Sequence, residues 1–382
     1  MSGNLQKKDY ELDLYHANVL VSLTDQLLVK ASERDPGQLP MFRFNNLHNG
    51  CSQFPNLITK PRLAYTFYDL YTVHSSPVVH QGRLYFGADS KALFCLDALT
   101  GTEIWRFKVQ AEIRSTPLIH GQFIYFGCFD HYFYCLNAEK GSLRWRFQTG
   151  DWIFSSPAIL SGVVYFSGMD GKLYALDSYN GKLIFQVSTG NWCIASPTII
   201  EGKVILGSRD GSLYAFDTAS GSVVWKSPLQ GPVHATAAIF NRKIFVGDTR
   251  GVFYCLDIDQ GKIFWEFAAS GAIFSSAAVS GSYCVYGNKK GELTCLDPDS
   301  GHLKWQVKCK RAIHSSPVIA GDSVLFGCDD GIFYNLNLHN GQIIWIFPTN
   351  DIIRSSAWVE NDRIWFGGLK LYCIENDYIY LI

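Results

Sequence analysis

The sequence predicts an all-β fold, an eight-bladed β-propeller of four-stranded antiparallel blades with a 40-residue repeat, closed by N- and C-terminal strands. Three observations predict it. A serine-rich element recurs at constant spacing, an aromatic residue recurs in register with it, and turn residues divide each period into four short β-rich runs. Such a period leaves almost no room for helices.

The repeat itself is read from the second residue of the serine-rich element, which is always Ser or Thr and recurs every 40 residues: Ser76, Thr116, Ser156, Ser196, Thr236, Ser276, Ser316 and Ser356. The same frame aligns the aromatic position: Trp105, Trp145, Phe185, Trp225, Trp265, Trp305 and Trp345, with Tyr65 one period ahead. Eight copies therefore fill the chain from about residue 63 to its end.

Within one copy, the turns are marked by residue pairs that end in glycine: Ser161-Gly162, Asp170-Gly171 and Asn180-Gly181. Glycine supplies the positive φ that tight turns need, so the copy reads as a meander of four antiparallel strands. One such sheet has two apolar faces and is marginal alone. Stacking the copies in a closed ring covers both faces, with the first strand along the axis and the aromatic strand outermost.

Closing the ring requires strands from both termini in the last blade. We expect the segment 63–67 ("LAYTF") to complete it, with 378–382 ("YIYLI") flanking or extending that sheet. Leucines at helical spacing near the start (Leu20, Leu23 and Leu27) predict a short helix, and a flexible arm is the alternative. The chain thus divides into an N-terminal arm (1–38), a lead-in segment (39–62) and the propeller (63–382).

The outer aromatic residue follows a corner of the form Asp-x-x-x-Gly, as in "LDALTGTEIWRF", "LDTASGSVVWKS", "LDIDQGKIFWEF" and "LDPDSGHLKWQV". This pattern resembles the PQQ-like (quinoprotein-type) propeller repeat over residues 40–382. The resemblance implies that the Trp of each blade docks on its neighbour. It is strongest to the non-enzymatic branch, which includes the propeller of the outer-membrane β-barrel assembly lipoprotein, although the lipoprotein signal is absent here. The corner aspartates, such as Asp97, are expected to cap the turn.

One position varies while its neighbours stay constant, namely the residue before each Ser/Ala-Ser/Thr pair: His74, Arg114, Phe154, Ile194, His234, Phe274, His314 and Arg354. Packing fixes the neighbours, so we expect this ring, at one mouth of the channel, to carry function. Blades seven, eight, one and two contribute His and Arg. The facing half is apolar, and Trp152 and Trp192 occupy equivalent loop positions beside it.

A mouth that is basic on one side and aromatic on the other suits an anionic ligand with an apolar body, or an acidic-aromatic peptide. We therefore predict a non-catalytic binding or scaffold propeller that docks a protein or peptide partner, or a small anionic ligand, at this mouth. The plainer alternative is that these side chains fill a wet channel and neutralise Glu112, Asp151 and Asp351. A second alternative is an enzyme or accessory subunit with a His/Arg site there.

No metal site is predicted, because the three mouth histidines come from distant blades and no Cys-x-x-Cys or His-x-x-x-His spacing occurs. Cysteines in one strand phase (Cys95, Cys135, Cys255 and Cys295) alternate with Ala175 and Ala215, which indicates a small buried site. The quinoprotein dehydrogenases implied by the resemblance hold their cofactor against a disulfide between adjacent cysteines, with calcium. No two cysteines are adjacent here, so no cofactor is predicted, and a PQQ-dependent dehydrogenase is the least favoured alternative.

Composition narrows the partners further. Basic and acidic side chains balance at 33 and 34, which argues against nucleic acid as a partner. The apolar stretch 17–29 is interrupted by Asp25 and preceded by acidic residues, so neither an export signal nor a membrane partner is expected. An odd count of 11 cysteines without an export signal predicts a reducing, cytoplasmic location.

Overall fold

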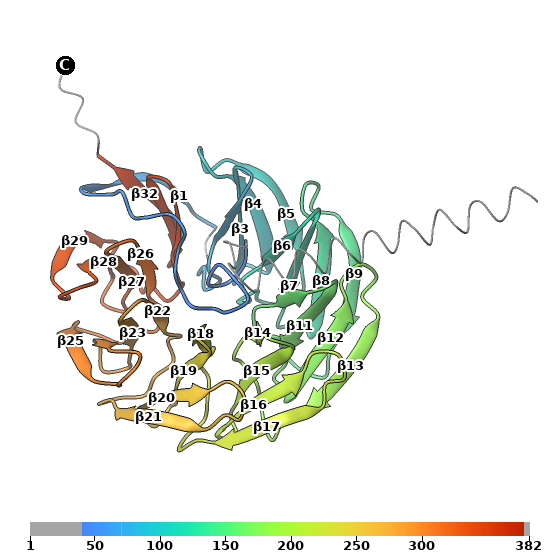
Figure 1. The fold of residues 1–382 in the computed structure, drawn as a ribbon. Helices are drawn as coiled ribbons and strands as arrows, with labels where there is room; N and C mark the ends of the chain where they lie inside the picture. The colour runs from blue at the N-terminus through green and yellow to red at the C-terminus, as the bar shows by residue number, and fades with distance from the viewer. Residues whose placement is uncertain (1–39, 70, 378–382) are drawn as a thin grey trace, which may run out of the picture.

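A computed structural model describes residues 40–69 and 71–377, and within them the chain forms eight four-stranded antiparallel sheets around a central channel (Figure 1). The eight-bladed propeller is thereby confirmed. Helices long and apolar enough to cross a membrane are absent from these described residues. The helix expected around Leu20 and the strand expected at 378–382 lie outside the described ranges.

The strands occupy equivalent places in every blade, and their bounds follow from the channel outward. The innermost strands are β2 (Val78–His80), β6 (Leu118–His120), β10 (Ala158–Leu160), β14 (Thr198–Ile200), β18 (Ala238–Phe240), β22 (Ala278–Ser280), β26 (Val318–Ala320) and β30 (Trp358–Glu360). The second strands are β3 (Arg83–Ala88), β7 (Phe123–Gly127), β11 (Val163–Ser167), β15 (Lys203–Ser208), β19 (Lys243–Gly247), β23 (Tyr283–Gly287), β27 (Ser323–Gly327) and β31 (Arg363–Gly367).

The third strands are β4 (Ala92–Asp97), β8 (Tyr132–Asn137), β12 (Lys172–Asp177), β16 (Ser212–Asp217), β20 (Val252–Asp257), β24 (Glu292–Leu296), β28 (Ile332–Asn337) and β32 (Leu371–Asn376). The outermost strands are β5 (Glu103–Lys108), β9 (Leu143–Gln148), β13 (Leu183–Ser188), β17 (Val223–Pro228), β21 (Ile263–Ala268), β25 (Leu303–Lys308), β29 (Ile343–Pro348) and β1 (Pro61–Phe67).

Burial changes from the middle of a blade to its rim. The third strands carry continuous buried runs such as Leu173 to Leu176, because neighbouring blades cover both faces of each sheet. The outermost strands alternate partly buried and exposed side chains, as β5 does. The cysteines expected at a small buried position are fully buried, and burial raises the pKa of Cys95 to about 11. The core therefore lies between the blades and packs them against one another.

The outer tryptophans join adjacent blades, as the resemblance implied. The indole N–H of Trp305 donates to the carbonyl oxygen of Leu338 in the next blade at 2.8 Å. The corner residue Gly341 lies directly under that indole, where an added Cβ would come within 2.8 Å of it, and its φ is +71°. The corner aspartates cap the turn as expected, for example Asp297, whose Oδ1 accepts the backbone N–H of Ser300 at 3.0 Å.

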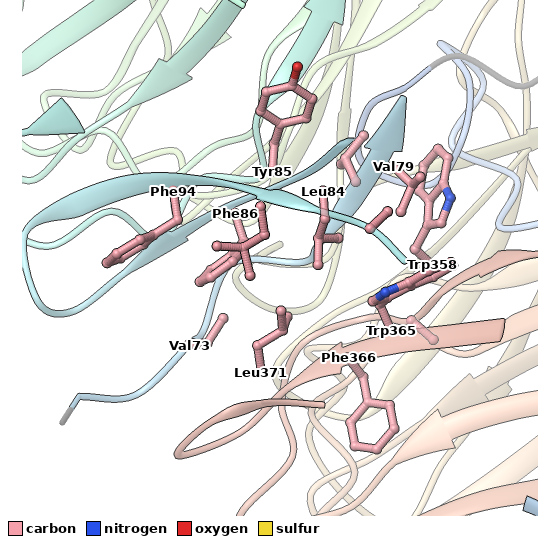
Figure 2. Packing of buried hydrophobic residues seen from close by; sticks show 14 of the residues in the cluster. Val73, Val79, Leu84, Tyr85, Phe86, Phe94, Trp358, Trp365, Phe366 and Leu371 are labelled. Atoms are coloured by element: carbon pink, nitrogen blue, oxygen red, sulfur yellow. The ribbon is translucent and has the colours of Figure 1, made fainter. Parts of the chain in front are cut away.

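The last blade is completed by the N-terminal strand, which confirms the predicted closure: β1 pairs antiparallel with β32. Tyr65 takes the place of the outer tryptophan, since its hydroxyl donates to the carbonyl of Ala98 in the first blade at 2.8 Å. The first and last blades share one apolar cluster. In Figure 2, Trp365 and Leu371 of the last blade lie next to Leu84 of the first blade. The junction between the chain ends is therefore packed like the others.

Candidate functional site

The serine-rich element forms a ring of hydrogen bonds around the channel. In seven junctions, the backbone N–H of the Ser or Thr in one blade donates to the hydroxyl of its counterpart in the next blade, at 2.9–3.2 Å. The bond from Ser356 to Ser76 joins the two ends of the chain at 2.9 Å. The preceding serine ties the segment before the innermost strand to the second strand of the same blade, as Ser315 does with Gly327. This frame explains why only the residue before it is free to vary.

All eight predicted ring residues line one cavity of about 260 Å³, together with the hydroxyl ring and Phe42. They lie in the extended segments that precede the innermost strands, not within those strands; His74, for example, comes four residues before β2. The sequence therefore grouped these side chains correctly. Their role in binding stays a prediction.

The lead-in segment closes the channel at its other end, which the sequence analysis did not foresee. Its blue trace crosses the centre of the ring in Figure 1. Innermost strands from five blades donate backbone N–H groups to its carbonyl oxygens: Ile119 to Pro40, Ile199 to Asn46, Ile239 to Leu47, Val279 to Asn49 and Ile319 to Gly50. Phe42 faces the cavity from this side. The lead-in segment therefore forms a floor to the cavity, opposite the mouth.

Arg43 anchors the floor. Its guanidinium is buried and donates to the carbonyl oxygens of His48 at 3.0 Å, Pro317 at 3.1 Å and Ala277. Burial lowers the pKa of Arg43 to about 9, so it remains protonated at pH 7. Three carbonyl partners stabilise the cation where water is excluded.

A second variable ring lies in the turn after each second strand, fifteen residues beyond the first ring: Asp89, Phe129, Met169, Arg209, Thr249, Lys289, Asp329 and Leu369. Sequence analysis missed it, although the same 40-residue alignment contains it. Its two aspartates hold the two arginines of the first ring. Asp89 accepts two hydrogen bonds from Arg114, both at 3.1 Å. Asp329 accepts two from Arg354, at 3.0 and 2.9 Å.

These pairs correct the predicted charge of the mouth. The carboxylates that neutralise the arginines are Asp89 and Asp329, and not Glu112, Asp151 and Asp351 as the plainer alternative supposed. His74 and His314 also lie against them, with Nε2 to carboxylate distances of 3.6 and 3.8 Å. Burial lowers the pKa of both histidines despite the adjacent carboxylates. Two arginines face two aspartates, so this half carries no net charge at pH 7.

Uncompensated positive charge lies on the facing half instead, where the sequence predicted an apolar wall. Within the described residues, Arg209 and Lys289 form no ion pair, and each lies over an aromatic ring: Arg209 over Trp192 at 4.1 Å, and Lys289 over Phe274 at 4.7 Å. His234 is near both cations. Burial, then Arg209 and Lys289, lower its pKa, and its buried Nδ1 has no hydrogen-bond partner in the described chain.

A second cavity of about 230 Å³ adjoins the mouth on this half, and it shares Arg114, Phe154, Ile194 and His234 with the first. Its remaining lining is Phe129, Trp152, Met169 and Trp192. The two tryptophans are 45% and 44% exposed, so their rings are accessible. Trp152 is stacked on Phe129, with ring centroids 5.0 Å apart and planes at 4°. Trp152 and Trp192 thus line a cavity that adjoins the ring, as predicted, and their role in binding stays a prediction.

The residues at the mouth do not fit the quinone cofactor that the resemblance implies for the quinoprotein dehydrogenases. All eleven cysteines are free thiols. Among the residues that the structure describes, the mouth carboxylates Asp89 and Asp329 are both engaged by arginines and so are not free to bind calcium.

Fold and mouth together define a PQQ-like propeller with a floored channel. Residues 71–323 match the family model described as the β-propeller of the beta-alanine-activating enzyme, and the chain belongs to that family. No curated protein matches the chain.

Solved structures share the fold at low identity. The chain is similar to BamB from Moraxella catarrhalis (17% identity, TM-score 0.72, covering 85% of this chain and 100% of BamB). It is also similar to the quinohemoprotein alcohol dehydrogenase from Comamonas testosteroni (14% identity, TM-score 0.80, covering 94% of this chain and 83% of the dehydrogenase). The computationally designed Ika8 protein matches at 14% identity and a TM-score of 0.73, covering 82% of this chain and 99% of Ika8. These likenesses confirm the PQQ-like propeller fold.

Proposed function

We propose that this protein is a binding propeller that captures an acidic peptide segment of a partner protein at the channel mouth, with an apolar side chain of that segment in the aromatic cavity. One observation carries the proposal. The blades share a rigid frame of hydrogen bonds, yet the residues that line the floored cavity differ from blade to blade. A scaffold that needed only stability would repeat these residues as it repeats its serines.

The charges decide which chemistry fits. An apolar side chain placed against Trp152 and Trp192 would gain about 1.5–3 kcal/mol from burial. An acidic group beside it would meet Arg209 and lie near His234, which lines both cavities. Charge-assisted hydrogen bonds of this kind contribute about 1.5–3 kcal/mol each. The Asp89–Arg114 pair is internally satisfied, so it would shape the rim without attracting an anion.

The family match suggests which kind of protein this propeller serves. The family name refers to an enzyme that activates beta-alanine, and we propose that the propeller serves such an enzyme as an accessory module that holds a partner segment. We retain the proposal of a cytoplasmic location, because eleven free cysteines suit a reducing compartment.

The test uses acetyl-Asp-Phe-Asp-amide as the probe and isothermal titration calorimetry on the full chain. We expect binding that is weakened at least tenfold when the probe acids are changed to amides or its Phe to Ala. Trp192→Ala and Arg209→Gln should each weaken binding by about 1.5–3 kcal/mol. Phe264→Ala is the matched control, since Phe264 is also an exposed aromatic residue (53%, against 44% for Trp192) but lies on the outermost strand β21. Equal binding by the two mouth variants and wild type would contradict the proposal.

A second candidate is an enzyme that uses the His-Asp-Arg groups. His74 lies 3.6 Å from Asp89, and its lowered pKa keeps it neutral at pH 7, as a general base requires. Replacing His74, His314, Arg114 and Arg354 together by Ala separates the candidates. If the fourfold variant loses the ability to turn over a substrate but still binds the peptide, the enzyme candidate is supported. If its substrate turnover is unchanged, these groups are excluded from catalysis.

A further inference from the structure

A cluster of metal-binding atoms lies where the chain crosses from the sixth to the seventh blade, and none of its three residues lines the mouth cavity. Cys309 follows β25, and Cys328 and Asp330 lie in the turn between β27 and β28. The two thiol sulfurs and a carboxylate oxygen are all within 4.8 Å of one another. Sequence spacing concealed the set, because a blade-to-blade crossing separates the two cysteines by nineteen residues.

The second blade provides an internal comparison. Cys128 there contacts the carbonyl oxygens of Ala111 and Glu112 at 3.4 and 3.5 Å, and the hydroxyl of Tyr134 donates to Asp130 at 2.8 Å. The seventh blade repeats this arrangement: Cys328 contacts the carbonyl oxygens of Arg311 and Ala312 at 3.4 Å, and Tyr334 donates to Asp330 at 2.8 Å.

What differs is the position after the outermost strand of the preceding blade, which is Val109 ahead of the second blade and Cys309 ahead of the seventh. The cysteine and aspartate of the turn thus belong to the repeated frame. The substitution of Val by Cys adds a second thiol to them.

We propose that Cys309, Cys328 and Asp330 bind a thiophilic divalent cation, with Zn²⁺ as the best match. Two thiolates and one carboxylate form a donor set that zinc accepts, and hard cations such as Mg²⁺ do not favour thiolates. A water molecule or the Tyr334 hydroxyl would complete a four-coordinate site. Asp330 is partly exposed and Cys309 is 6% exposed, so an ion reaches the cluster from solvent.

Binding at this cluster requires that protons leave. A thiol must lose its proton before it can bind a cation as a thiolate. Zinc binding must therefore release protons, and affinity must rise with pH. The cluster also borders the mouth, since Asp329, between Cys328 and Asp330, holds Arg354. A bound cation would fix that turn.

The test uses the chelator-treated, reduced full chain with Co²⁺ as a spectroscopic probe and Zn²⁺ as competitor. We expect one equivalent of Co²⁺ to give a thiolate charge-transfer band that one equivalent of Zn²⁺ abolishes, and a melting temperature that rises with Zn²⁺. Cys309→Val should remove both effects. Its affinity loss should exceed the roughly 10–100-fold that follows loss of a residue that merely hydrogen-bonds a metal ligand.

Two features keep this test interpretable. Cys309→Val recreates the residue set of the second blade, so the variant is expected to fold, and Cys128→Ala is the matched control that should bind Zn²⁺ like wild type. Absence of the charge-transfer band, equal Zn²⁺ binding by Cys309→Val, or a Cys309–Cys328 disulfide that survives reduction would overturn the proposal. The peptide assay at the mouth is independent of all three results, so each proposal can fail alone.

Discussion

Glycine at the blade corner is where indole docking is most directly perturbed. Gly181 has a φ of +73°, and a Cβ added there would lie 2.6 Å from Cδ2 of Trp145 in the preceding blade. Gly162 has a φ of +76°, yet nothing lies within 4 Å of an added Cβ. Alanine at either position incurs the same backbone cost, about 1–2 kcal/mol. Their difference therefore isolates the contact with Trp145.

The size of that difference follows from the geometry. Carbon atoms pack at about 3.5–4.0 Å, so the indole must move by about 1 Å. That movement weakens the hydrogen bond from its N–H to Ser178, now 3.2 Å, which is worth about 1 kcal/mol, and it disturbs the packing. We expect Gly181→Ala to lower the free energy of unfolding by about 2 kcal/mol more than Gly162→Ala. Removing the ring entirely, in Trp145→Ala, costs about 3–5 kcal/mol and sets the upper limit.

The assay is equilibrium unfolding in urea, followed by tryptophan fluorescence and by far-UV circular dichroism. In the double variant Trp145→Ala/Gly181→Ala, the indole is already absent. Adding Gly181→Ala to Trp145→Ala should therefore lower the free energy of unfolding by no more than Gly162→Ala does in the wild type. Equal destabilisation by Gly181→Ala and Gly162→Ala, or additive effects in the double variant, would refute the docking account.

Two further predictions concern the floor and the mouth. Gly50→Ala should lower the melting temperature more than Gly82→Ala, because an added Cβ at Gly50 would overlap the Arg43 guanidinium, whereas nothing lies within 4 Å of one at Gly82; both glycines have positive φ. Loss of the partners of a buried cation destabilises a protein by about 3–5 kcal/mol, so equal shifts in melting temperature would contradict the role given to Arg43. Peptide affinity should rise as the pH falls from about 7.5 to about 5.5, because a bound anion raises the lowered pKa of His234 and so favours its protonation. Calorimetry should show this pH dependence in the wild type but not in His234→Gln, and a wild-type affinity that does not change with pH would place the acidic group elsewhere.

The fold could be predicted because its information is repeated. Each serine, corner glycine and outer aromatic residue occurs in nearly every copy, so local ambiguity in one blade is resolved by the others. Closure was predictable for the same reason, since Tyr65 stands in the aromatic frame ahead of the first blade. The eight ring residues also followed from the alignment, as the variable position between constant neighbours.

The charge of the mouth could not be predicted in the same way. Asp89 pairs with Arg114 from the next blade, and that pairing depends on side-chain reach across a junction, which periodicity does not reveal. The floor was missed because the lead-in lies outside the repeat, so no other copy indicates where Phe42 and Arg43 go. The cysteine cluster was missed because its two thiols come from opposite ends of a crossing.

A crystal structure of the protein with acetyl-Asp-Phe-Asp-amide tests the central claim most directly. The account predicts the phenyl ring between Trp152 and Trp192, and a probe carboxylate within hydrogen-bonding distance of Arg209. A probe bound on an outer blade face, or beneath the floor near Arg43, with the mouth empty, would contradict it.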